Sequence, residues 1–206
     1  MVTLKSKILL VISFLPLLIM ANEVEAEAEA EVFLQLVSQR YEQIVTFQAD
    51  FRQTNSWASM DKKLESSGRL YYDAENLILR YSQPQEQVLK IYQDEISIYD
   101  ATKNQLIISE NQDVSLQPLE ILQQYWDISD IYLLEGENSY SVKLEYPSGK
   151  VEATVIDRLI YDIVIEDSSG NRVGYYFQNI ALNQELSADI FEISLDEDCE
   201  IIDLRK

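Results

Sequence analysis

Apolar and polar residues alternate with a period of two along much of this chain, which is the pattern of β-strands that bury one face. The clearest example is the stretch Gly68–Asp100, where four apolar-rich runs are separated by short polar turns. Runs of this length between clusters of Asp, Asn, Ser and Pro predict an antiparallel meander. The predicted strands are Arg69–Tyr72, Leu77–Tyr81, Gln87–Tyr92 and Glu95–Tyr99.

The same alternation predicts strands before and after this meander. Thr46–Thr54 has Phe47, Ala49 and Phe51 on one face and polar residues on the other. The polar stretch Asn55–Ser67 is interpreted as a hairpin connection, and Ile180–Ser187 as a second connection. The remaining predicted strands are Gln105–Ser109, Ile131–Leu134, Ser139–Tyr146, Val151–Val155, the hairpin pair Leu159–Glu166 and Arg172–Asn179, and Ile190–Ile193.

Two segments instead repeat their apolar residues at helical spacing. The first helix is predicted roughly over Ala30–Gln43, and its apolar stripe consists of Phe33, Leu36, Val37, Tyr41 and Ile44. The second is predicted over Pro118–Tyr125, where proline suits the first turn and Leu119 and Leu122 form an apolar edge. Ten to twelve successive strands without a βαβ rhythm predict a mainly β fold. A single antiparallel sheet of this size must curl or close, and helices over its concave face would enclose an apolar pocket.

The first residues of the chain follow a different pattern. Lys5 and Lys7 precede the apolar run Ile8–Met20, which is short for a membrane span and contains Pro16. This predicts a signal peptide over residues 1–21, with cleavage as late as residue 26, followed by one domain over residues 22–206. Because no cysteine lies near the cleavage site, we expect an exported protein without a lipid anchor, located in a bacterial periplasm.

Composition narrows the function classes. The chain has 36 acidic and 16 basic residues and a net charge of −20, so it lacks the basic footprint of a nucleic-acid binder. It has no histidine, and Cys199 is its only cysteine, which removes the common general base, the common metal ligand and any intrachain disulfide. No cofactor or metal site is indicated. A glycosidase that uses two carboxylates needs no histidine, but no acid pair stands out, and we do not expect an enzyme.

Arg80 is the one residue that breaks the apolar pattern of the central strands. It shares a face with Ile78 within the run Leu77–Tyr81. A guanidinium among apolar side chains reaches either solvent or a partner, because burying the charge alone is costly.

The order of several short motifs resembles the LolA family of periplasmic lipoprotein carriers across nearly all of the predicted domain. The segment Phe47–Gln53 is similar to the family's opening strand, and Gly68–Tyr72 to its Gly-x-Phe strand. Leu79-Arg80-Tyr81 stands where the family has an aromatic-Arg-Trp triplet, although both flanking aromatics are changed. The remaining matches are Pro84 with Gln87, Ile98-Tyr99-Asp100, the hairpin Asp167–Asn179, Asn183, and Phe191-Glu192-Ile193. The family's usual Pro-Gly near the C-terminus is replaced by Leu195-Asp196-Glu197-Asp198.

The resemblance implies an incomplete, strongly curved antiparallel barrel of about eleven strands, with short helices over a concave hydrophobic cavity. It implies a periplasmic chaperone that shields the acyl chains of lipoproteins. Its expected partners are acylated lipoproteins, a LolCDE-type inner-membrane transporter and a LolB-type outer-membrane acceptor, and we expect a monomer. The family's triplet arginine locks the lid helices, and Arg80 is the matching residue here.

The apolar faces of the predicted strands supply candidate cavity residues, with Leu119 and Leu122 from the predicted lid helix. Strand parity cannot be fixed from the sequence, so a slip of one residue would invert each set. The alternatives are a carrier or sensor of the same fold with a different ligand, and a purely structural β-protein that takes up no apolar probe. The candidate strand residues are Phe47, Ala49, Phe51, Leu70, Tyr72, Ile78, Val88 and Tyr92.

Overall fold

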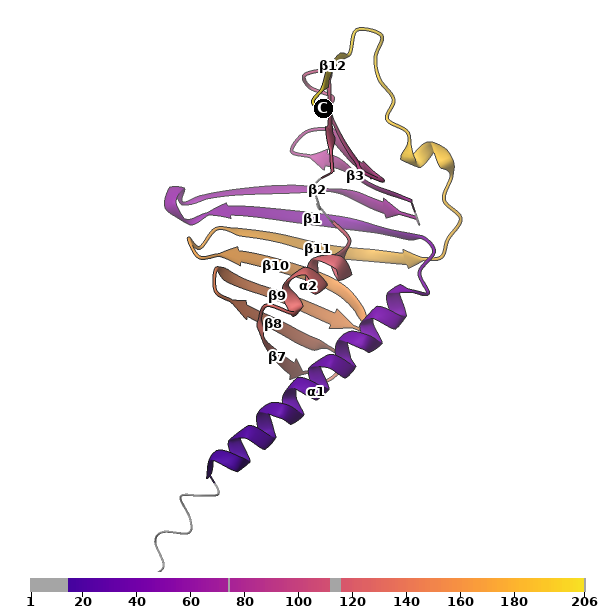
Figure 1. Ribbon diagram of the computed structural model, residues 1–206. Coiled ribbons are helices and arrows are strands. Elements are labelled where there is room, and N and C mark those ends of the chain that lie inside the picture. The colour runs from indigo at the N-terminus through magenta and orange to yellow at the C-terminus, as the bar shows by residue number, and fades with distance from the viewer. Residues whose placement is uncertain (1–14, 74, 112–115, 206) are drawn as a thin grey trace, which may run out of the picture.

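A single sheet of twelve strands organises the chain (Figure 1). The computed structural model describes residues 15–73, 75–111 and 116–205, with side chains described from Ala28 onward. The strand order is β12-β6-β5-β4-β3-β2-β1-β11-β10-β9-β8-β7, so the two ends of the sheet do not meet and the barrel is open. All neighbouring strands are antiparallel except β12 and β6, which are parallel.

Eleven of the twelve strands lie where the alternation of the sequence predicts a strand, and β12 near the C-terminus was not predicted. The predicted mainly β fold with an incomplete, curved sheet is therefore confirmed. The strands are β1 (Phe47–Trp57), β2 (Lys62–Tyr72), β3 (Asn76–Gln83), β4 (Gln87–Tyr92), β5 (Glu95–Asp100), β6 (Gln105–Glu110), β7 (Asp130–Glu135), β8 (Tyr140–Tyr146), β9 (Gly149–Ile156), β10 (Leu159–Asp167), β11 (Arg172–Leu182) and β12 (Glu200–Asp203).

β1 and β2 form one long hairpin, which corrects the prediction that Asn55–Ser67 is a connection. The two strands pair from Phe47 with Tyr72 to Trp57 with Lys62, and only the 3-10 turn η1 (Ala58–Met60) and Asp61 join them. The outer half of this hairpin projects beyond the core. Its polar residues need no apolar face there, because the backbone ladder alone pairs the strands.

A bulge where β2 meets β3 requires a glycine. The pairing shifts register between Ser67 and Gly68. A Cβ on Gly68 would lie 1.9 Å from the carbonyl oxygen of Arg80, a separation that no side chain tolerates. The bulge bends the sheet at the point where the long horizontal strands of Figure 1 give way to the steeper strands β3 to β6.

The two α-helices lie on one face of the sheet, in front of β7 to β11 in Figure 1. Helix α1 (Leu15–Tyr41) packs on β7 and β10, and α2 (Pro118–Trp126) packs on β8, β9 and β10. We call the sheet face that carries these helices the inner face. Residues 1–14 of the expected signal peptide lie outside the described residues. No helix in the described ranges has both the length and the apolar character needed to cross a bilayer.

A segment near the C-terminus crosses the opposite, outer face. We call residues 183–199, between β11 and β12, the strap; it runs along the right side of Figure 1. Its start is fixed by Asn183, whose Oδ1 accepts from Val45 N at 2.7 Å. The strap contains the 3-10 turn η2 (Ala188–Phe191), which contacts β3 and replaces the strand predicted at Ile190–Ile193.

The two covered faces carry two apolar cores of different size. The main core lies between the inner face and the helices. The smaller one lies between the outer face and the strap, and its buried members are Tyr71, Ile78 and Phe191. The strands β2 and β3 are thus buried on both faces, which explains why Leu77, Ile78 and Leu79 are apolar without alternation.

Candidate functional site

The inner face of β1, β2 and β11 is aromatic and buried. Phe47 on β1 has no exposed surface, and its ring stacks on that of Tyr72 with centroids 5.3 Å apart and planes 11° apart. Phe177 on β11 meets Phe47 edge-on, with ring centroids 6.4 Å apart. Burial, together with the negative charge of Glu120 on α2, raises the pKa of Tyr72 to about 12. The phenol of Tyr72 is therefore neutral at any physiological pH.

Helix α2 covers this face with an apolar edge. Leu119, Ile121, Leu122 and Trp126 are all buried, and Leu122 is completely so. Pro118 stands in the first turn, as the sequence predicts, and the helix is nine residues long. A helix this short is marginal by itself in water, so its packing on the sheet supplies its stability.

Three polar bonds between described residues tie the two helices to each other and to the sheet. Trp126 Nε1 donates to Glu31 Oε1 at 3.1 Å, and Gln123 Nε2 donates to Ser38 Oγ at 3.3 Å. Ile160 N on β10 donates to the hydroxyl of Tyr41 at 3.1 Å, and burial raises the pKa of this tyrosine far above its usual range. Each such bond contributes only about 1 kcal/mol net, so mainly apolar packing holds the helices down.

A groove of about 750 Å³ runs beneath α1 at the β7 end of the sheet. Its helical wall is formed by Val32, Phe33, Leu36 and Val37, and its floor by Leu133, Tyr140 and Val155. The rings of Phe33 and Tyr140 close one part of it, with centroids 4.9 Å apart. A second opening of about 380 Å³ lies between α1 and α2, where Tyr41, Tyr72 and Leu119 reach its surface.

The inner face of β4 to β6 forms an apolar strip that neither helix covers extensively. The two helices pack mainly against β7 to β10. Across the register, Leu89 pairs with Ile98, Ile98 with Ile107, and Ile91 with Ile96, so these side chains share one face. All five are partly exposed. The strip adjoins the main core through Leu89 and Ile91.

The structure divides the candidate cavity residues between the two faces. The inner face of β1 and β2 carries Phe47, Ala49, Phe51, Leu70 and Tyr72, which pack in the main core with Leu119 and Leu122. Ile78 and Val88 instead lie on the outer face in the small core, and Tyr92 follows Val88 by parity. The placement of these three on the cavity side is wrong, because strands buried on both faces give no parity signal.

Arg80 has a different partner from the one that the family resemblance implies. Its Nε and Nη2 donate to the carbonyl oxygen of Ile190 at 3.2 and 2.7 Å, and Nη2 also donates to that of Glu192 at 2.6 Å. Both carbonyls belong to the strap, and none of these bonds reaches α1 or α2. Arg80 therefore fastens the strap to β3 and not the lid helices to the sheet.

Sequence reasoning also missed the residues that do tie the helices. Glu31 lies in a Glu/Ala repeat whose pattern predicts no contact. Trp126 is predicted only to belong to the apolar edge that follows Pro118. The strap is likewise a polar segment without periodicity. Within the described residues, no three His, Cys, Asp or Glu side chains are grouped so that they could hold a metal ion.

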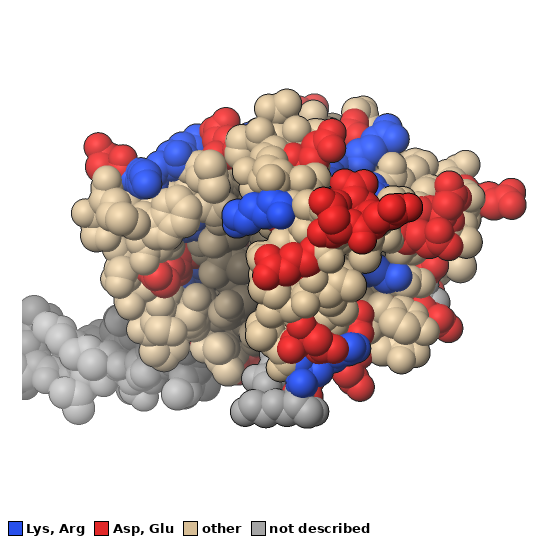
Figure 2. All heavy atoms as spheres, turned by 90° about the horizontal axis from the view of Figure 1, so that it is seen from above, with Lys and Arg blue, Asp and Glu red and all other residues tan. Residues whose placement is uncertain are grey.

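Charged side chains are unevenly distributed over the face seen from above. Viewed from above, acidic side chains gather on the side of the molecule where β12 and the strap lie, and a hollow separates this side from the other (Figure 2). The acidic residues of this region include Asp196, Glu197, Asp198, Glu200 and Asp203.

Comparison with known proteins agrees with this architecture. The model of the family described as outer membrane lipoprotein carrier protein LolA matches residues 42–194, which include β1 to β11, α2 and most of the strap. The chain belongs to the LolA family. This family is periplasmic and its description is that of lipoprotein carriers.

Solved structures resemble this LolA-family protein at low identity. An uncharacterized conserved protein from Thermus thermophilus is 16% identical, covers 85% of this chain and 99% of its own, and has a TM-score of 0.55. A LolA superfamily protein from Nitrosomonas europaea is 13% identical, covers 80% of this chain and 97% of its own, and has a TM-score of 0.46. The former similarity shows the fold alone. No curated protein matches the sequence.

Proposed function

We propose that this protein carries lipoproteins through the periplasm by enclosing their acyl chains between the inner face and the helices α1 and α2. The observation that supports this proposal is the composition of the contact: two helices close an apolar sheet face mainly through buried apolar side chains. Lifting the helices would expose a continuous apolar surface, whereas closing them hides it.

The energetics favour such a device for a triacylated cargo. Each CH₂ that leaves a bilayer for water costs about 0.8 kcal/mol, so the acyl chains of a lipoprotein do not leave unaided at a useful rate. An apolar surface of matching size offsets this cost. The helix packing that must be broken first lowers the net affinity, which keeps the cargo transferable to an acceptor that binds it more tightly.

The open groove beneath α1 and the apolar strip of β4 to β6 extend the proposed acyl surface. Both adjoin the enclosed core, and both are partly exposed when the helices are closed. We expect the first acyl contacts at these places, because they need no prior movement of α2. The residues Phe47, Ala49, Phe51, Leu70 and Tyr72 would become available only after the helices separate.

The proposed donor is a LolCDE-type transporter in the inner membrane and the proposed acceptor a LolB-type protein of the outer membrane. The net charge of −20 would steer docking to a basic face of such a partner. Association that slows as salt is added supports this steering, and association that is insensitive to ionic strength contradicts it.

A release assay tests the carrier proposal directly. Proteoliposomes that contain the transporter and a labelled lipoprotein are incubated with the exported form of the protein, and soluble complex is separated from vesicles. We expect a soluble complex with the wild type and much less with Leu119→Gln, which places an amide on the enclosed face of α2. Leu64→Gln is the matched control, because Leu64 is 44% exposed on the projecting hairpin.

The outcomes separate carrier, related carrier and structural protein. If no soluble lipoprotein complex forms although a fluorescent fatty-acid probe enters the protein, the proposal fails in favour of a carrier or sensor of another lipid. If neither ligand binds, the protein has only the fold of its family. Loss of complex with both Leu119→Gln and Leu64→Gln would show a general defect of the protein. It would then give no support to a role of α2 in binding the acyl chains.

A further inference from the structure

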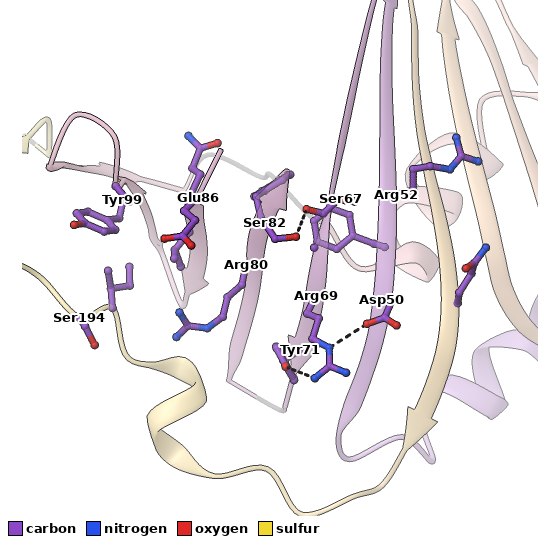
Figure 3. A pocket seen from close by; sticks show the side chains of 18 of the residues that line it. Asp50, Arg52, Ser67, Arg69, Tyr71, Arg80, Ser82, Glu86, Tyr99 and Ser194 are labelled. Carbon is purple, nitrogen blue, oxygen red and sulfur yellow. Dashed lines mark hydrogen bonds and ion pairs between the residues drawn. The ribbon is translucent and has the colours of Figure 1, made fainter. Parts of the chain in front are cut away.

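A large pocket lies on the outer face, on the side of the sheet opposite the helices. Its volume is about 880 Å³, within the usual range for small-molecule sites. Strands β1, β2 and β3 form its floor, β4 and β5 one side, and Ile193 and Ser194 of the strap a wall (Figure 3). The pocket lies on the face opposite the proposed acyl site, and both are built on β1 to β3.

Three arginines line this pocket from three adjacent strands. They are Arg52 on β1, Arg69 on β2 and Arg80 on β3. Arg69 and Arg80 stand directly opposite each other in the strand register. Like charges at opposed positions of a sheet destabilise it, unless counter-charges compensate them. Such a row is unexpected in a chain whose acidic residues outnumber its basic residues 36 to 16.

Of the three guanidiniums, only that of Arg69 forms an ion pair with a carboxylate among the described residues. Arg69 Nε donates to Asp50 Oδ1 at 3.0 Å. Among the described residues, Arg80 has main-chain carbonyls as its only partners. The guanidinium of Arg52 lies over the ring of Tyr176, 4.1 Å from its centroid, and forms no ion pair with any described acid. Including Glu86 on the rim, the lining carries three positive and two negative charges.

The bonds that hold Arg80 and Arg69 leave part of each guanidinium free. Arg80 uses Nε and Nη2 for the strap, and its Nη1 donates to none of the described residues. Arg69 uses Nε for Asp50 and Nη1 for the hydroxyl of Tyr71 at 3.3 Å, so its Nη2 donates to no described residue either. In Figure 3 the two arginines extend toward the same end of the pocket, with Tyr71 between them, while Arg52 extends toward β11.

We propose that this outer pocket binds a small molecule through a phosphate group, either a free phosphoester or the headgroup of a phospholipid. Guanidiniums fixed in place by carbonyl and carboxylate partners are preorganised donors for phosphate oxygens. A phosphate offers more acceptor oxygens than a carboxylate, and Tyr71 and Ser194 add hydroxyl donors on the same lining. The volume of the pocket leaves room for an organic part beside Val88 and Tyr99.

Titration calorimetry with three probes tests this site: inorganic phosphate, glycerol 3-phosphate, and a short-chain phosphatidylglycerol below its micelle concentration. We expect saturable binding of at least one phosphoester, weakened about tenfold or more in Arg69→Gln and in Arg80→Gln. Arg172→Gln is the matched control, because it removes the same charge from the exposed hairpin of β10 and β11 and should bind within about twofold of the wild type.

Arg69→Gln keeps the test valid if loss of Arg80 loosens the strap, since Arg69 has no bond to the described residues of the strap. Preference for glycerol 3-phosphate identifies a free phosphoester, and preference for the phospholipid identifies a headgroup. The proposal is overturned if none of the three probes binds at several millimolar, or if Arg172→Gln weakens binding as much as Arg69→Gln does.

Discussion

The part of the sheet formed by β7 to β10 and the part formed by β4 to β6 are covered on opposite faces, and β3 between them is buried on both. In β8 and β9, Val142, Leu144, Val151 and Ala153 face the helices, and the residues between them are polar and face solvent. In β4 to β6 the strap lies on the outer face, and the inner face keeps a partly exposed row of Leu and Ile. Only the part under the helices is therefore an ordinary two-layer core.

The difference teaches how a single sheet offers two distinct binding surfaces. The helix-covered half can open only by moving α1 and α2, so it suits a cargo that is enclosed and later released. The strap-covered half already has an apolar strip on its inner side and a polar, arginine-lined pocket on its outer side. Substitutions can separate the contributions of the two halves, beginning with the strand that they share.

Phe47→Ala should have the largest effect, because it removes the aromatic centre common to both halves. The ring is completely buried between Tyr72 and Phe177, so its loss leaves a cavity that costs about 3 to 5 kcal/mol. Urea unfolding followed by circular dichroism measures this loss. If Phe47→Ala lowers the stability of only one half, seen as two separate transitions, the halves are independent and the comparison needs revision.

Leu122→Ala should come next and should act on the helix-covered half. Its side chain is fully buried beneath α2, and we expect a loss of about 3 kcal/mol, concentrated in the packing of that helix. Hydrogen exchange checks the location: amides of α2 should lose protection while those of β3 and β4 keep it. Equal loss of protection in β3 and β4 contradicts a boundary between the halves.

Phe191→Ala is the corresponding change in the strap-covered half. Phe191 packs on Tyr71 and Ile78 in a core of few residues, where neighbouring groups can collapse into the space, so we expect a smaller loss of about 2 kcal/mol. Protease cleavage within residues 183–199 should accelerate while α2 remains protected. Unchanged cleavage there would mean that the hydrogen bonds of Arg80 hold the strap without this apolar anchor.

The same difference explains how much of each half can be predicted from the sequence. Strands β8 to β10 and helix α2 are predictable nearly to the residue, because one buried face gives clean alternation or helical spacing. In β3 the run Leu77, Ile78 and Leu79 is apolar on both faces. The sequence therefore does not indicate on which face of the sheet Ile78 lies, or Val88, which pairs with Arg80. The sequence gives equally little indication that the strap covers the outer face of β3.

The strap and the polar ties of the lid cannot be predicted for a related reason. The strap contacts the sheet through single residues and main-chain carbonyls, and carbonyl groups carry no sequence signal. The tie between Glu31 and Trp126 joins residues 95 positions apart in regions without a motif. Long-range partners of this kind depend on how two elements pack, which no local pattern encodes.

Glu31→Ala should destabilise the closed position of the helices α1 and α2 by about 1 kcal/mol without disturbing the core. It removes the acceptor of Trp126 Nε1, while Glu31 itself is exposed on α1. We expect faster uptake of an apolar fluorescent probe and a shift in tryptophan emission. Glu31→Gln, which removes the charge but keeps an oxygen acceptor for Trp126 Nε1, is the control. Uptake that rises equally in both variants would point to charge and not to the tie.

Asp100→Asn should have the smallest effect and belongs to the strap-covered half, at the turn between β5 and β6. A hydrogen bond from Thr102 Oγ1 at 2.6 Å, followed by Lys103, holds the pKa of Asp100 below its ordinary value of about 4. Because the folded pKa is the lower one, the unfolded chain binds more protons in acid. The stabilisation is therefore complete above the ordinary carboxyl pKa and disappears as the pH falls through the folded pKa.

We expect wild type and Asp100→Asn to differ by less than about 1 kcal/mol at neutral pH and to converge in acid. Urea midpoints measured across this range check it, and a difference that grows toward low pH would show that the turn depends on the shape of the side chain and not on its charge.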